Sequence, residues 1–222
     1  MVFPESFIRR LQTNGGSMRT LILAGGALAL GTAAQAATIT QTERFDPVIV
    51  VDGGSRSAET VIAQSGRIAD VDLVVDLTGS GGTITDGGDP VGGGDAAFEE
   101  LSLSLTSPRD TEVALIPRQT FSTGDSRRIT LFLDDESDRV LSGEPVNGPF
   151  RPVSPLSAFD GEDAAGTWTV TIGDSVEVNP KSLNEFQLQI ETESAVIPVP
   201  ATLPLMASAL GLLGLAARHR HR

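Results

Sequence analysis

The middle of the chain alternates between apolar and polar residues with a period of two. In residues 70–77, Val and Leu occupy every second position and Asp most of the others. Residues 101–105, 167–172 and 186–190 repeat the alternation with Ser, Thr or Gln at the polar positions. This period is that of a β-strand with one buried and one exposed face. Shorter candidates lie at residues 48–51, 113–116 and 129–133.

The segments between these predicted strands are rich in Gly, Pro and Asp, and residues 45–193 show no sustained helical stripe. Many short strands separated by such turns indicate a sandwich or a barrel. The segment Gly79–Ala97 has almost nothing to bury and would lose much backbone entropy on ordering. We therefore expect a mobile surface loop there.

Composition excludes several classes of function. The chain has no Cys, which excludes disulfides, thiolate metal sites and cysteine nucleophiles. Its two histidines, His219 and His221, lie in the last four residues, so no Ser–His–Asp triad is expected inside a folded domain. The 29 acidic residues outnumber the 16 basic ones, and we expect no nucleic-acid partner. These exclusions favour a protein that is not an enzyme.

The N-terminus predicts export. Met18 and Arg19 precede an apolar run, and Ala34-Gln35-Ala36 follows it as the small-x-small pattern that a signal peptidase accepts. The apolar run is too short to span a membrane. We expect an over-extended gene start at 1–17, a signal peptide at 18–36 and a spacer at 37–44.

The C-terminus predicts sorting. Residues 201–217 carry no charge and precede the basic end RHRHR. As a helix this run would span roughly 25 Å, slightly less than a hydrocarbon core of about 30 Å. Together with Pro198, Pro200 and Ala201, the segment 197–222 resembles a PEP-CTERM sorting signal of the Val-Pro-x-Pro-Ala variant. The resemblance implies a transmembrane sorting helix at 201–217, an exosortase-type protease as processing partner and a final place in the cell envelope, at the surface or outside the cell.

The domain between these ends resembles the P domain, also called the homo B domain, of subtilisin-like proprotein convertases. The most specific residues run from Pro155-Leu156-Ser157-Ala158-Phe159 to Gly166-Thr167-Trp168, and Leu103–Pro108 and Ser182–Leu188 agree with them. The resemblance covers residues 45–193 and implies a jelly-roll-like antiparallel β-sandwich. In the family this module follows a catalytic domain. Only about eight residues separate Ala36 from Phe45, so we expect any catalytic subunit to be another chain.

Three residues of this segment have a structural interpretation. Trp168 is the one tryptophan and lies on an alternating strand, which favours a core anchor that fills the space between the sheets. We also assign Phe159 a structural role. Gly166 marks the turn into that strand. A sugar-stacking role for Trp168 is the alternative, and the period of two disfavours it.

Calcium is the metal that the acidic loops suggest, because hard cations prefer oxygen ligands. One loop contributes Asp134, Asp135 and Asp138, and another contributes Asp160 and Asp163. The resemblance also supports calcium, because some related β-sandwich domains attached to subtilases bind it. The alternative is a solvated acidic surface, because residues 37–197 hold 28 acidic and 10 basic residues, a formal charge of −18.

The sequence therefore predicts an exported, surface-sorted, non-catalytic β-sandwich that acts as an interaction or stabilising module. Two alternatives remain. One is an accessory domain of a serine endopeptidase system, with a subtilase as partner. The other is a module that binds carbohydrate such as exopolysaccharide.

Overall fold

The computed structural model describes residues 36–193, which form strands and two short 3₁₀ helices and contain no α-helix. The all-β class expected from the alternation is confirmed. The elements in chain order are β1 (Thr38–Val51), β2 (Gly54–Ile62), β3 (Ile68–Gly79), β4 (Thr83–Ile84), β5 (Pro90–Val91), η1 (Phe98–Glu100), β6 (Leu101–Thr106), β7 (Glu112–Ile116), β8 (Arg127–Leu133), β9 (Gly148–Phe150), η2 (Leu156–Phe159), β10 (Gly166–Asp174) and β11 (Lys181–Thr192).

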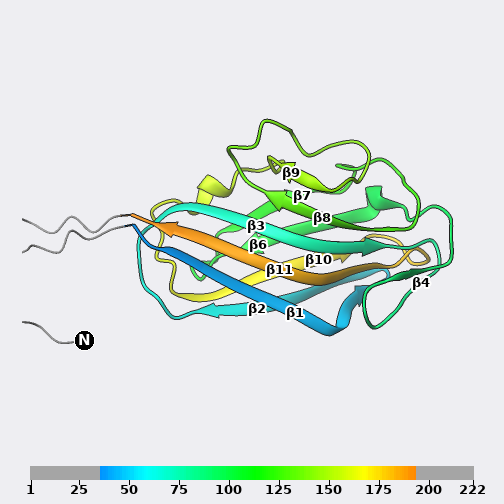
Figure 1. Cartoon of the computed structure of the whole chain (residues 1–222), viewed down its shortest axis with the longest axis horizontal. Helices are drawn as coiled ribbons and strands as arrows, with labels where there is room; N and C mark the ends of the chain where they lie inside the picture. The colour runs from blue at the N-terminus through cyan, green and yellow to red at the C-terminus, as the bar shows by residue number, and fades with distance from the viewer. Residues whose placement is uncertain (1–35, 194–222) are drawn as a thin grey trace, which may run out of the picture. The chain divides into compact units, whose positions relative to one another are not determined.

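Two open sheets pack face to face (Figure 1). One has the order β1-β11-β3-β8-β9, and the other has the order β2-β10-β6-β7. All pairs in them are antiparallel except β8 with β9. The chain crosses between the sheets after β1, β2, β3, β7, β9 and β10, and β6 pairs directly with β7. This is the strand order of a jelly roll, with β9 added at one edge. The small pair β4-β5 stands apart from both sheets.

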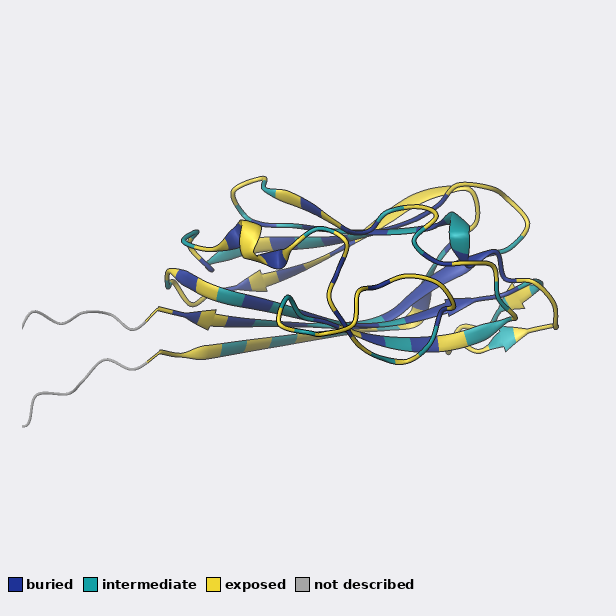
Figure 2. Cartoon of the chain, turned by 90° about the horizontal axis from the view of Figure 1, so that it is seen from above, coloured by how far each residue is buried: buried dark blue, intermediate teal, exposed yellow. Residues whose placement is uncertain are grey.

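The hydrophobic core lies between the two sheets and comes from the alternating positions. Val71, Leu73, Val75 and Leu77 of β3 are at most 1% exposed, and the intervening residues are half-buried. In β10, Trp168, Val170 and Ile172 are fully buried in the same way. Figure 2 shows buried positions alternating with exposed or intermediate ones along the strands. The period of two in the sequence therefore arises because one face of each sheet packs into the core.

The sandwich begins earlier than expected, because residues 38–44, which we assigned to a spacer, form the first half of β1. Thr38 pairs with Glu191 and Arg44 with Glu185 across the antiparallel pair with β11. This half of β1 is exposed or half-buried along its length, so its side chains carry little hydrophobic signal. The backbone of β11 nevertheless gains a partner on that side.

The Gly-rich segment after β3 is a packed loop and not the loose one expected. Gly81 N donates to Ser126 Oγ at 2.8 Å, and Thr78 Oγ1 donates to the Gly88 carbonyl at 2.6 Å. At Gly88 φ is +85°, and a Cβ would lie 2.5 Å from Asn184 Oδ1. Glycine is needed here because the backbone approaches its neighbours closely, which is a separate reason from chain mobility.

The predicted signal peptide and sorting tail fall outside the described residues, apart from Ala36. This applies to Ala34, Pro198, Pro200 and Ala201, and to the apolar run 201–217. Within residues 36–193 no helix is long and apolar enough to cross a membrane.

Candidate functional site

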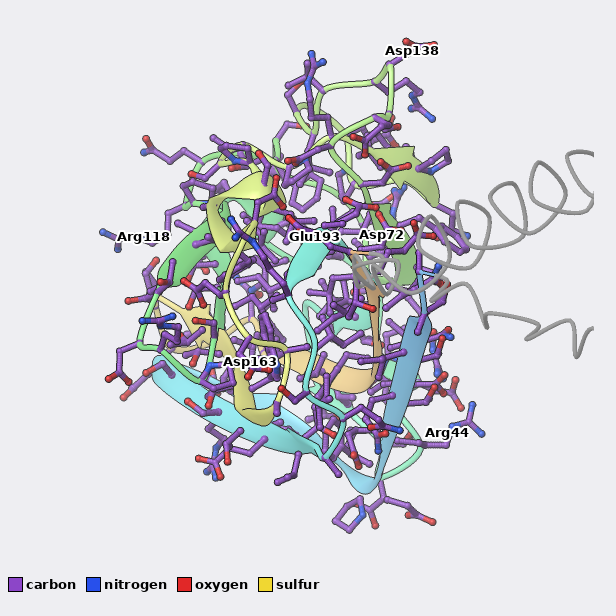
Figure 3. The ribbon with its side chains drawn as sticks, turned by 90° about the vertical axis from the view of Figure 1, so that its left-hand side faces the viewer. Arg44, Asp72, Arg118, Asp138, Asp163 and Glu193 are labelled. Carbon is purple, nitrogen blue, oxygen red and sulfur yellow. The ribbon has the colours of Figure 1, made fainter. Side chains whose placement is uncertain are left out.

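Carboxylates gather at the end of the sandwich where β3 begins and β11 ends. Antiparallel pairing places Asp70 opposite Glu191, and Ala37 at the start of the described chain hydrogen-bonds Thr192 in the same region. The β8–β9 connection and the residue after η2 add further acidic groups. We call this surface the acidic end, and its members are Asp70, Asp72, Asp134, Asp135, Glu136, Asp160, Glu191 and Glu193. Figure 3 views the sandwich from this side, with Asp72 and Glu193 near its centre.

Partial burial and the repulsion between neighbouring carboxylates raise the pKa of Asp72 at the acidic end. Burial raises the pKa of Asp72 to about 6, and the charges of Asp70, Asp134, Glu136 and Glu191 add to the rise. Its Oδ1 atom is buried and accepts no hydrogen bond. A carboxylate in this position costs free energy when it is ionised, so a neighbouring positive charge would stabilise it.

Two other carboxyls of the acidic end hold their protons more readily than usual. The pKa of Glu136 is raised first by a side-chain hydrogen bond with Asp134 and then by the charge of Asp70. Burial, followed by the charges of Asp70, Asp135 and Glu193, raises the pKa of Asp160. The acidic end therefore holds more negative charge than its surroundings balance.

Of the five aspartates predicted to bind calcium, Asp134, Asp135 and Asp160 belong to the acidic end, and Asp138 and Asp163 are not among its members. Asp135 accepts hydrogen bonds from Leu156 N and Ser157 N, both at 2.9 Å, and so caps η2. Asp134 accepts one from Glu136 N at 2.7 Å. Asp138 is exposed, and Figure 3 places it far from Asp163.

Asp163 is occupied by its own loop. Its Oδ1 accepts hydrogen bonds from Ala165 N at 3.0 Å and Gly66 N at 3.1 Å, and Ser65 Oγ donates to Oδ2 at 2.8 Å. These bonds, first the one from Ala165, lower the pKa of Asp163. In the part of the chain that the structure describes, no group of three or more acidic or histidine side chains is arranged to hold a metal ion.

The residues given a structural role lie in or against the core. Trp168 is fully buried, its Nε1 donates to the Ala164 carbonyl at 2.9 Å, and Phe159 packs edge-on against it with ring centroids 5.1 Å apart. At Gly166 φ is +133°, and a Cβ would lie 2.5 Å from Pro108 Cβ. An indole without exposed surface offers no face on which a sugar could stack.

An exposed aromatic on the outer face of the larger sheet was missed by the sequence analysis. Phe132 of β8 is 48% exposed, with Val74 beside it on β3 and Pro149 on β9. The same row continues through Gln187 of β11 to Thr42 of β1. The sequence does indicate this exposure, because Phe132 lies between Leu131 and Leu133, at a position where an alternating strand normally has a polar residue.

Comparison with known proteins gives one family match. Residues 96–190, less than half of the chain, match the family model described as proprotein convertase P-domain. The match runs from the loop before η1 almost to the end of β11, so β1, β2 and β3 lie outside it. No curated protein matches the chain.

Several solved structures are similar at low identity. The serine protease of Aeromonas sobria in complex with its chaperone is 17% identical, with a TM-score of 0.42 over 73% of this chain and 28% of that chain. The same protease alone gives 15% and 0.40, over 72% and 27%. FlhE gives 11% and 0.38, over 72% of this chain and 99% of that one. The chain thus spans little more than a quarter of the length of the protease chains. Its similarity to a known family is limited to residues 96–190, which resemble the proprotein convertase P-domain.

Proposed function

We propose that this chain is an exported, surface-sorted and non-catalytic P-domain-like module that binds and stabilises a partner protein. The match of residues 96–190 to the P-domain model is the observation that supports it. The partner that this similarity favours is a serine endopeptidase whose catalytic domain is on another chain. The module then serves as an accessory domain of a proteolytic system.

The acidic end is the surface that suits a partner. It presents carboxylates from four separate segments, and Asp72 among them is partly buried and lacks a hydrogen-bond partner for Oδ1. A partner with clustered Lys and Arg would be attracted over a distance of about 10 Å at moderate salt. It would also relieve the repulsion among the carboxylates, so association would be fast and salt-sensitive.

The test is co-purification of the tagged full chain from envelopes of the producing cells. A serine protease chain should be retained at low salt and lost at high salt. The double variant Asp72→Asn/Asp160→Asn should retain much less of it. Asp86→Asn/Asp89→Asn, which removes two charges from the exposed loop at the opposite end, is the matched control. Retention of no protease, or equal retention by both double variants, would contradict the proposal.

Export and sorting belong to the same proposal and are supported by the sequence motifs at the two ends. The mature chain then begins at Ala37, directly after Ala34-Gln35-Ala36. N-terminal sequencing of protein from the envelope should find Ala37, and a start at Met1 or Met18 would contradict export through this signal. Loss of the apolar run 201–217 from the mature mass would indicate processing of the tail.

Carbohydrate binding is a second candidate, favoured by the row of Phe132. The exposed ring of Phe132, with Gln187 and Thr42 two and three strands away in the same row, offers stacking and hydrogen bonds on one open face. Retention of the chain on the cell's own exopolysaccharide should then be lost in Phe132→Ala. It should survive in Val61→Ala, which removes an exposed side chain from the other sheet.

A further inference from the structure

The chain contains one lysine, Lys181, and its side chain is fully buried. Every other basic residue apart from the two histidines is Arg, which is too weak a base to lose its proton in proteins. Lys181 begins β11, and its Nζ donates a hydrogen bond to the Asn179 carbonyl. The same Nζ lies 3.5 Å from Asp174 Oδ2 and 3.9 Å from Glu100 Oε2.

These three groups make a poor ion cluster. Asp174 is only 2% exposed, and its Oδ2 has no hydrogen-bond partner. Glu100 Oε2 is also buried without one. The ammonium keeps its hydrogen bond to the Asn179 carbonyl, but Asp174 Oδ2 and Glu100 Oε2 lose their hydration without gaining a hydrogen bond in return. A reaction that removes charge here is therefore favoured by the surroundings.

Protonation at this cluster is shifted toward neutral acids. Burial raises the pKa of Asp174, and the attraction of Lys181 opposes that rise only in part. Burial likewise raises the pKa of Glu100, with the charge of Asp174 adding to it. Transfer of a proton from Lys181 to the Asp174 carboxylate would leave a neutral amine beside a neutral acid, with the Glu100 carboxylate still able to accept a proton.

We propose that Lys181 and Asp174 condense into an isopeptide bond, with Glu100 as the proton carrier. The lone pair of the neutral amine attacks Asp174 Cγ. The contact of 3.5 Å between Nζ and Asp174 Oδ2 already holds the amine against this carboxyl group. Glu100 takes a proton from the nitrogen and returns it to the leaving hydroxyl. An amide forms, one water leaves, and no oxidant or other reactant is needed.

The surroundings suit this reaction. A cavity of about 560 Å³ adjoins Glu100 and gives the released water a place to go, and its lining is Glu99, Glu100, Arg118, Gln119, Ser175 and Val176. Asp174 ends β10 in the four-stranded sheet, and Lys181 begins β11 in the five-stranded sheet. The bond would therefore tie the two sheets together in a chain that has no cysteine to do so.

Fragment analysis of the full chain tests the bond directly. A glutamate-specific protease, acting on denatured protein, cuts after Glu162, Glu177 and Glu185, which releases fragments 163–177 and 178–185. With the bond in place the two fragments stay joined, and the pair is lighter than their sum by one water. An amine-reactive probe should also leave Lys181 unlabelled in denaturant. Separate fragments with a labelled Lys181 would overturn the proposal.

Variants assign the roles. Lys181→Arg and Asp174→Ala should give separate fragments, whereas Asp174→Asn should give a joined pair of the wild-type mass because ammonia leaves in place of water. Glu100→Gln should leave most of the chain unjoined, and Glu99→Gln, its neighbour at the same cavity, should join fully. Circular dichroism would verify that each variant folds. A folded Glu100→Gln chain that joins as completely as wild type would overturn the role of Glu100.

Discussion

The two ends of the sandwich both concentrate carboxylates, but they do so in opposite surroundings. At the acidic end, eight carboxylates from four segments face outward or are half-buried, with Arg67 paired to Glu193 at 3.1 Å between exposed side chains. At the other end Asp174 and Glu100 enclose Lys181 away from solvent. The acidic end can relieve its repulsion by taking up protons or a partner. At the buried end, internal proton transfer or bond formation can remove the charges.

From this difference we expect that substituting a charged side chain lowers the free energy of unfolding much more at the buried end than at the acidic end. Water and ions screen the exposed carboxylates, so each contributes little to the free energy of unfolding. The buried charges are not screened, so removing one partner leaves the others uncompensated.

The largest effect is expected for Lys181→Met, which removes the charge and keeps much of the volume. The loss should be about 3–5 kcal/mol of unfolding free energy at pH 7, because the variant cannot form the proposed amide and leaves the carboxylates of Asp174 and Glu100 buried without a cation. The loss should shrink as pH falls, since both carboxyls have raised pKa values and become neutral. Urea unfolding at pH 7 and pH 5 measures it.

The matched control is Arg44→Met, which breaks the exposed pair of Arg44 with Glu185 at 2.8 Å. Its loss should lie within about 0.5 kcal/mol. Equal losses for the two variants would mean that burial does not separate the two ends.

A smaller effect is expected for Asp135→Ala at the acidic end. The variant removes the two hydrogen bonds to Leu156 N and Ser157 N and should cost about 1–2 kcal/mol. Here a carboxylate stabilises the fold by capping η2, with its charge a secondary factor. Asp135→Asn keeps an acceptor and should recover about half of the loss, and a variant as unstable as Asp135→Ala would argue against the cap.

The fold class could be predicted from the sequence, but the contacts between residues far apart in the chain could not. Alternation in β3, β10 and β11 was readable because one face of each strand enters the core. The first half of β1 was missed because neither of its faces is fully buried. The tight loop around Gly88 depends on Asn184, which is 96 residues away, and no local pattern reveals that contact. Composition alone describes such a segment as loose.

The candidate sites divide in the same way. Phe132 could have been found, because an aromatic at a polar position of an alternating strand is a local signal. Lys181 could not, because in the sequence it is a single charged residue after a proline and before a polar serine. Its burial depends on Asp174 and Glu100, which the fold brings to it from other elements.

Asp72→Asn should change how stability depends on pH. The folded-state pKa of Asp72 is about 6 against an ordinary 3.8, so between these values the folded chain binds more protons than the unfolded one. Wild-type stability should therefore rise as pH falls from 7 toward 4, by about 1 kcal/mol after solvent screening. The variant should lose most of that rise, and Asp86→Asn should keep it. An unchanged rise in Asp72→Asn would place the titration elsewhere.

The smallest effect is expected for Asp138→Asn. This variant tests whether Asp138 belongs to a solvated charged surface or to a metal site. Asp138 is exposed, and the carboxylates predicted to join it as calcium ligands are occupied by backbone hydrogen bonds at Asp135 and Asp163. The substitution should change the unfolding free energy by less than about 0.5 kcal/mol. Thermal midpoints should be equal in calcium and in chelator for both proteins. A midpoint that rises with calcium in wild type and not in Asp138→Asn would show instead that the acidic end rearranges to hold the ion.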